Sequence, residues 1–125
     1  MKVNSSDKIY NLCDEFKNKD REHVIVVGVD TQNQVIYKEV VFIGTLNQSV
    51  IHPREIFKRA IMMSCASIFL IHNHPGGTLE ASYNDLEVTR RIKKAGKLLG
   101  IDLKDHLIIT NDSFFSFRHE QIGGF

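Results

Sequence analysis

Two short apolar runs constrain the fold of this chain more than any other feature of its sequence. His23 to Val29 (HVIVVGV) is rich in β-branched residues and too short for an ordinary helix, so it predicts a strand buried on both faces. Ala66 to Ile71 (ASIFLI) predicts a second short apolar strand. A sheet built from such strands is covered by helices, which indicates an α/β domain.

Apolar residues recur at helical spacing in three other segments. The first helix is expected over residues 5–19, with Ser5 or Ser6 as its cap. A second helix begins at Pro53, because proline suits the first helical position, and a third covers residues 82–99. We expect the buried positions to be Ile9, Leu12, Cys13 and Phe16 in the first helix, Ile56, Phe57, Ala60, Ile61 and Ser64 in the second, and Leu86, Thr89, Ile92 and Leu99 in the third.

The remaining β-rich segments predict two hairpins. Residues 35–43 follow a short polar turn and would pair with the first strand, and residues 105–110 and 114–118 would pair at the end of the chain. The order α-β-β-α-β-α-β-β describes one α/β domain over residues 1–125, with a mixed sheet flanked by helices. The N-terminal helix (1–20) is expected to be part of this same domain.

Composition limits the classes of protein that need to be considered. The chain has 125 residues, 42% hydrophobic and 25% charged, which is ordinary for one globular domain and argues against disordered or fibrous classes. The formal net charge of +1 does not favour nucleic-acid binding through bulk charge. We find no apolar stretch that could cross a membrane and no signal-peptide pattern, so we expect a cytoplasmic protein with Cys13 and Cys65 reduced and buried.

The segment from His72 to Thr89 carries the groups best suited to chemistry. It contains His72-x-His74, then seven residues, then Ser82-x-x-Asp85. Residues two apart at the end of a strand point to the same side, so both imidazoles can face one point, and a Gly-Gly loop allows Asp85 to reach it. Two imidazoles and one carboxylate suit Zn²⁺ and leave a fourth tetrahedral position for water, as in catalytic zinc sites.

A purely structural interpretation of the same residues is also open. Ser82 and Asp85 have the spacing of a capping box at the start of a helix. A His-x-His pair at a strand end is, by itself, often only a surface feature. The two interpretations are compatible, because Asp85 can bind a metal ion while Ser82 caps the helix.

The arrangement His-x-His, seven residues, Ser-x-x-Asp resembles the JAMM motif of the JAB/MPN metalloproteases. The surrounding sequence, over about residues 20–125, is most similar to the bacterial RadC family. The similarity includes Pro53-Arg54-Glu55, the HNHP core, Ser82-x-x-Asp85-x-x-x-Thr89, Leu99-Gly100-Ile101 and Asp105-His106. It implies a three-layer fold of the JAB/MPN (cytidine-deaminase-like) type. Gly76 and Ala81 depart from the serine and proline that RadC-like chains usually have there, which bears on substrate positioning rather than on metal binding.

The resemblance implies a zinc-dependent metallopeptidase or isopeptidase, in which zinc-bound water attacks an amide carbonyl. His72, His74 and Asp85 would bind the zinc ion. Ser82 would donate a hydrogen bond to the oxyanion or to the bound substrate.

The resemblance also implies an upstream glutamate as general base. Glu22 lies at the junction of the first helix and the first strand, where the family has this residue, and we favour it. Glu55 is the other candidate, although the dipole of the second helix already favours an acidic residue there.

Other functions stay open from the sequence. The domain could bind a metal ion or a protein without turnover, or act as a DNA-repair-associated accessory protein, as the RadC name suggests. A peptide or protein substrate is favoured over nucleic acid because the charge is near neutral and the basic run 90–97 fits a solvated helix face. The helix-hairpin-helix segment often found ahead of this domain in RadC proteins does not occur in this sequence, which also weakens the DNA interpretation. His106 would either orient a zinc ligand or pack at a strand start.

Overall fold

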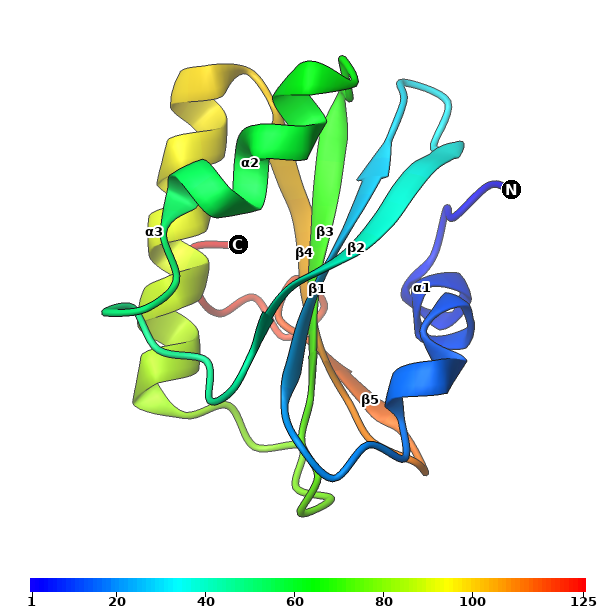
Figure 1. Ribbon diagram of the computed structural model, residues 1–125, viewed down its shortest axis with the longest axis vertical. Coiled ribbons are helices and arrows are strands. Elements are labelled where there is room, and N and C mark those ends of the chain that lie inside the picture. Colours follow the sequence, from blue (N-terminus) through cyan, green and yellow to red (C-terminus); the bar gives the residue numbers. More distant parts are fainter.

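The computed structural model describes residues 1–125 and contains a five-stranded mixed sheet in the order β2-β1-β3-β4-β5 (Figure 1). The strands are β1 (His23–Val29), β2 (Val35–Ile43), β3 (Ser67–Asn73), β4 (Asp102–Ile109) and β5 (Phe114–Ser116). The helices are α1 (Ser6–Leu12), α2 (Pro53–Met62) and α3 (Tyr83–Leu99), and a 3₁₀ turn, η1 (Asp14–Phe16), follows α1. The predicted α/β class and order of elements are confirmed.

Helices cover both faces of the sheet. Figure 1 shows α2 and α3 on one side of the strands and α1 on the other. Val24 of β1 belongs to the apolar cluster that contains Phe57 of α2 and Ile92 of α3, whereas its neighbour Ile25 belongs to the cluster that contains Ile9 of α1. Successive residues of β1 therefore enter different cores, which explains why this strand is a continuous apolar run. None of the helices has the length and apolarity needed to cross a membrane.

The strand directions bring distant segments of the chain to one end of the sheet. β1 is antiparallel to β3, with Val24 opposite His72, so the start of β1 lies beside the end of β3. β3 and β4 are parallel and are joined through α3. The loop after β3 and the start of α3 consequently lie at this same end of the sheet.

The N-terminal helix is shorter than predicted. α1 ends at Leu12 rather than near residue 19, because the Lys38 ammonium of β2 donates to the Leu12 carbonyl (3.0 Å) and the chain tightens into η1. The buried Phe16 then packs in the core on the α1 side of the sheet. The predicted cap is confirmed, since the Ser5 hydroxyl oxygen accepts from the Lys8 N–H (3.4 Å).

The buried faces of α2 and α3 also differ from the prediction. Ile61 is 53% exposed, and Ser64 is exposed beyond the end of α2. Leu99, in the last turn of α3, is 48% exposed. Gly96 takes the inward position instead, because a Cβ atom there would lie 2.4 Å from the carbonyl oxygen of Ile101. Close approach of α3 to the start of β4 therefore sets which face of this helix is buried.

The two cysteines are free and buried, as predicted. Burial raises the pKa of the Cys13 thiol to about 12, so this group stays protonated at neutral pH. Both side chains act as apolar core residues, one in each of the two apolar clusters.

Asp105 of β4 connects α1 and the C-terminal residues to the sheet. Its Oδ1 atom accepts from the N–H groups of His106 (2.7 Å) and Arg118 (3.0 Å). Its Oδ2 atom accepts from the hydroxyls of Ser6 (3.1 Å) and Ser116 (2.5 Å). The carboxylate is buried and all its partners are neutral donors, so these four hydrogen bonds compensate for its desolvation.

We expect the Asp105→Ala variant to lose about 3 kcal/mol or more of unfolding free energy, because four donors lose their acceptor. Urea unfolding followed by circular dichroism measures this loss. Asp112→Ala, at an exposed turn position, is the control and should change the free energy by no more than about 0.5 kcal/mol. Equal midpoints for the two variants would show that Asp105 does not have this role.

Candidate metal centre

The side chains that the sequence singled out meet at the end of β3. One ligand atom from each of Glu22, His72 and His74 lies within 4.8 Å of the other two, so these three residues could hold a metal ion. Glu22 reaches this point because it directly precedes β1, and its carbonyl accepts from the Gly44 N–H (2.8 Å) after β2. The β1–β3 pairing therefore joins residues that are far apart in the sequence.

The two histidines direct their Nε2 atoms toward each other. The Nε2–Nε2 distance is 2.9 Å, in line with the prediction that residues two apart face the same side. His72 is fully buried, and the side chain of His74 is 12% exposed. The Nδ1 atom of His74 lies 2.9 Å from the Thr78 carbonyl oxygen, which can only accept, so Nδ1 carries the hydrogen. Nε2 is therefore the ring nitrogen of His74 that faces the centre.

Asp85 supplies a carboxylate from the first turn of α3. Its Oδ1 atom lies 3.4 Å from Nε2 of His72, and its Oδ2 atom lies 3.7 Å from Nε2 of His74. Burial raises the pKa of Asp85, but the adjacent His72 ring, the Ser82 N–H and the nearby His106 together lower it to about 2. The carboxylate is therefore ionised at neutral pH.

Ser82 and Asp85 also form the predicted capping box. The Ser82 hydroxyl oxygen accepts from the Asp85 N–H (3.0 Å), and Oδ2 of Asp85 accepts from the Ser82 N–H (2.9 Å). Ser82 is exposed, and its hydroxyl makes this one hydrogen bond as an acceptor. Its hydrogen is free to be donated to another molecule.

Asn73, between the two histidines, was not predicted to matter. Its side-chain oxygen accepts from the His23 N–H (2.6 Å), and its side-chain NH₂ donates to the Arg21 carbonyl (2.9 Å). Asn73 thus holds the residues on both sides of Glu22, whose carboxylate lies 3.8 Å from Nε2 of His74. The signal in the sequence was its position between His72 and His74 at a strand end, where its side chain points to the opposite side from theirs.

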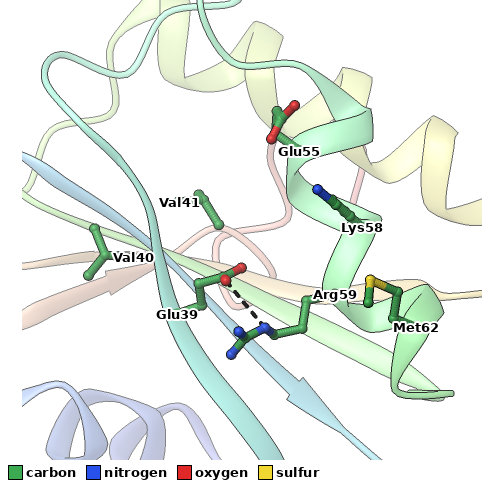
Figure 2. A pocket seen from close by; sticks show the side chains of 7 residues that line it. All are labelled: Glu39, Val40, Val41, Glu55, Lys58, Arg59 and Met62. Atoms are coloured by element: carbon green, nitrogen blue, oxygen red, sulfur yellow. Dashed lines mark ion pairs between the residues drawn. The ribbon is translucent and has the colours of Figure 1, made fainter.

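Glu55, the other candidate base, lies elsewhere on the molecule. Its carboxylate is 3.8 Å from Arg54, and it is not grouped with the histidines. It lines a groove of about 400 Å³ between β2 and α2, where Arg59 and Glu39 form an ion pair at 3.2 Å (Figure 2). The position of Glu22 therefore suits the chemistry of the centre better than the position of Glu55.

A third histidine lies behind His72. The Nε2 atom of His106 is 2.8 Å from Nδ1 of His72, and the His106 ring is fully buried and stacked on Phe117 (centroids 4.3 Å apart). Burial lowers the pKa of His106 well below its usual range, and the neighbouring His72 lowers it further. His106 therefore packs inside β4 rather than at its start, and it also contacts a candidate ligand.

The chemistry of the converging groups fits a divalent metal ion. The atoms brought together are ring nitrogens and carboxylate oxygens, and the ion-pair partners of Glu22 and Asp85 are histidines only. Imidazole and carboxylate are the ligands that zinc takes in catalytic sites. This donor set therefore suits a divalent metal ion.

Comparison of this sequence with known proteins identifies a matching family and several similar proteins. The profile of the RadC-like JAB domain matches residues 3–122. A UPF0758 protein of Geobacillus kaustophilus is 44% identical over 87% of this chain and 48% of its own length. A UPF0758 protein of Bacillus licheniformis is 46% identical over 87% and 49%, and one of Methanosarcina mazei is 42% identical over 95% and 52%. The chain spans about half the length of the curated relatives it matches, and their names state no activity.

We expect Asn73→Ala to loosen the segment that carries Glu22, because it removes both side-chain hydrogen bonds to that segment. The unfolding free energy should fall by about 1–3 kcal/mol. Amide hydrogens at residues 21–24 should exchange faster in hydrogen-exchange mass spectrometry. Asn111→Ala, at an exposed turn position, is the control. Unchanged exchange at residues 21–24 would contradict the positioning role of Asn73.

Proposed function

The chain belongs to the RadC-like JAB domain family, and we propose that it is a zinc-dependent hydrolase that cleaves amide bonds in peptides or proteins. The observation that carries this proposal is the convergence of Glu22, His72, His74 and Asp85 at the end of β3. A zinc ligand set and a separate carboxylate at one point are the parts that a metal-assisted hydrolase needs.

His72, His74 and Asp85 are the residues proposed to hold the zinc ion. Support comes from the 2.9 Å separation of the two Nε2 atoms and from the ionised carboxylate next to them. When bound, zinc lowers the pKa of water toward neutrality and polarises a carbonyl group.

Glu22 is the proposed general base. It reaches the centre from the position just before β1, while the other three groups come from the end of β3, from the residue after β3 and from α3. Its side chain is 18% exposed. Glu22 can accept a proton from the attacking water and deliver it to the leaving amine. Ser82 is proposed to donate its free hydroxyl hydrogen to the oxygen of the substrate carbonyl.

Differences in exposure leave one side of the centre open to a substrate. His72 and Asp85 are buried, whereas Glu22 and His74 are partly exposed and Ser82 is exposed. An amide bond can therefore approach the groups that act on it while the inner ligands stay fixed by the core.

Zinc content tests the proposed ligand set. The wild-type chain purified in zinc-replete buffer should contain about one equivalent of zinc, measured by mass spectrometry of the metal. His74→Ala should contain much less, because it removes a ligand, whereas His119→Ala replaces an exposed histidine away from the centre and should keep it. A zinc-free wild-type protein would overturn the proposal.

Turnover tests the proposed base. Glu22→Gln should keep its zinc and lose amide hydrolysis by about 10²–10⁴-fold, the usual contribution of a positioned base. Release of new amines from a library of peptide and isopeptide amides is the measurement, and Glu55→Gln is the matched control.

Two results would contradict the role of Glu22. Equal activities of Glu22→Gln and Glu55→Gln would mean that Glu22 is not the base. Zinc-loaded wild type without turnover on any amide would favour a module that binds a metal or a protein without catalysis.

A further inference from the structure

Two buried polar side chains, those of His106 and Thr89, lie behind His72. The Nδ1 atom of His72 is 2.8 Å from Nε2 of His106, and Nδ1 of His106 contacts the Thr89 hydroxyl. The Thr89 hydroxyl donates to the Asp85 carbonyl oxygen at 2.7 Å. We name this series, from His72 through His106 and Thr89 to the Asp85 carbonyl, the His72 relay. Thr89 and His106 have no exposed surface, and neither side chain takes part in the proposed reaction.

The position of the Thr89 hydrogen follows from the last contact of the relay. A hydroxyl has one hydrogen, and the Asp85 carbonyl oxygen can only accept. If Thr89 donated to His106 instead, its oxygen and the Asp85 oxygen would face each other at 2.7 Å with no hydrogen between them. Thr89 therefore donates to Asp85 and accepts from Nδ1–H of His106.

The state of His106 follows next. A buried imidazolium needs an acceptor or a carboxylate to compensate for its desolvation, and the neighbour of Nε2 is another imidazole. His106 is therefore neutral, with its one hydrogen on Nδ1 and a lone pair on Nε2. The stacked Phe117 ring, inclined by 8°, holds the imidazole in this plane.

We propose that Thr89 and His106 are positioning residues that fix His72 in its Nδ1–H tautomer and so turn the lone pair of its Nε2 atom toward the metal centre. The hydrogen between the two rings has to be on His72, because the facing Nε2 atom of His106 accepts. This inference rests on the proposed zinc site. A neutral imidazole with the opposite tautomer would direct an N–H at the centre and could not bind zinc through that atom.

The relay also links two proposed ligands. It ends on the carbonyl of Asp85, whose carboxylate lies 3.4 Å from Nε2 of His72. The tautomer of His72 and the placement of Asp85 therefore depend on the same docking of α3 against β4. The Nδ1 hydrogen of His74 is held separately, by the Thr78 carbonyl, so it should stay on Nδ1 when the relay is changed.

Thr89→Val is the sharpest test, because it keeps the shape of the side chain and removes the hydroxyl. Zinc affinity, measured by competition with a chelator, should fall by about 10–100-fold, the usual effect of losing a partner of a ligand. Thr89→Ser keeps the hydroxyl and should restore affinity close to that of the wild type.

A matched control separates this effect from a loss of stability. Thr110 is also buried, and its hydroxyl donates to the Ser113 carbonyl (3.0 Å) in the turn between β4 and β5. Thr110→Val should lower the unfolding free energy and leave zinc affinity unchanged.

The tautomer itself can be measured without any metal. Long-range ¹H–¹⁵N spectra of the histidine rings should show Nδ1–H and unprotonated Nε2 for His72 in the wild type and in Thr89→Ser. In Thr89→Val, His106 loses the acceptor for its Nδ1 hydrogen, so the population of this His72 tautomer should decrease. The His74 ring should keep its hydrogen on Nδ1 in every variant, because the Thr78 carbonyl accepts it.

The outcomes distinguish this inference from the proposed function. Wild-type affinity in Thr89→Val, or an Nε2–H tautomer of His72 in the wild type, would overturn the inference and leave a zinc hydrolase possible. Absence of zinc binding by the wild type would overturn the proposed function, and the metal-free spectra would still decide whether the relay sets the tautomer.

Discussion

The antiparallel pairing of β1 with β3 is the interaction on which the rest of the structure depends. All seven residues of β3 are buried, and the pairing aligns Val24 with His72 so that the start of β1 meets the end of β3. Apolar cores lie on both faces of these strands, so a slip of one residue would move each side chain to the opposite core. The register that stabilises the domain is therefore also the register that brings Glu22 to the histidines.

This register also buries polar groups, and their hydrogen bonds explain why the end of β3 is ordered. Burial of a polar side chain is unfavourable unless it is hydrogen-bonded. Asn73 is bonded to the chain before β1, His72 contacts His106 of β4, and Thr89 is bonded within α3. The single buried side-chain atom without a partner is the Tyr37 hydroxyl, in β2. The candidate centre thus keeps its geometry only while β1, β4 and α3 are all docked on β3.

Local sequence patterns predict the helices and strands well. They fail where a contact with a residue far away in the sequence determines a helix end or its buried face. The apolar runs, the capping serines and the proline at the start of the second helix all predicted what is observed. The end of α1 depends on Lys38 of β2, and the buried face of α3 depends on how closely Gly96 approaches Ile101. The periodicity of apolar residues carries no information about either contact. In the same way, motif spacing singled out the converging residues but not Asn73, whose importance comes from its hydrogen bond to the chain at the start of β1. The spacing also did not indicate that Thr89 contacts His106 behind His72.

Asp85 shows why the structural and chemical interpretations of the motif need not compete. Its Oδ2 atom accepts from the Ser82 N–H and completes the cap, while its Oδ1 atom is the one closest to His72. The cap holds the carboxylate in a fixed orientation, and its hydrogen bonds replace part of the hydration that burial removes. A carboxylate restrained in this way loses little conformational freedom when it binds a cation, so the helix cap itself prepares the centre for a metal ion.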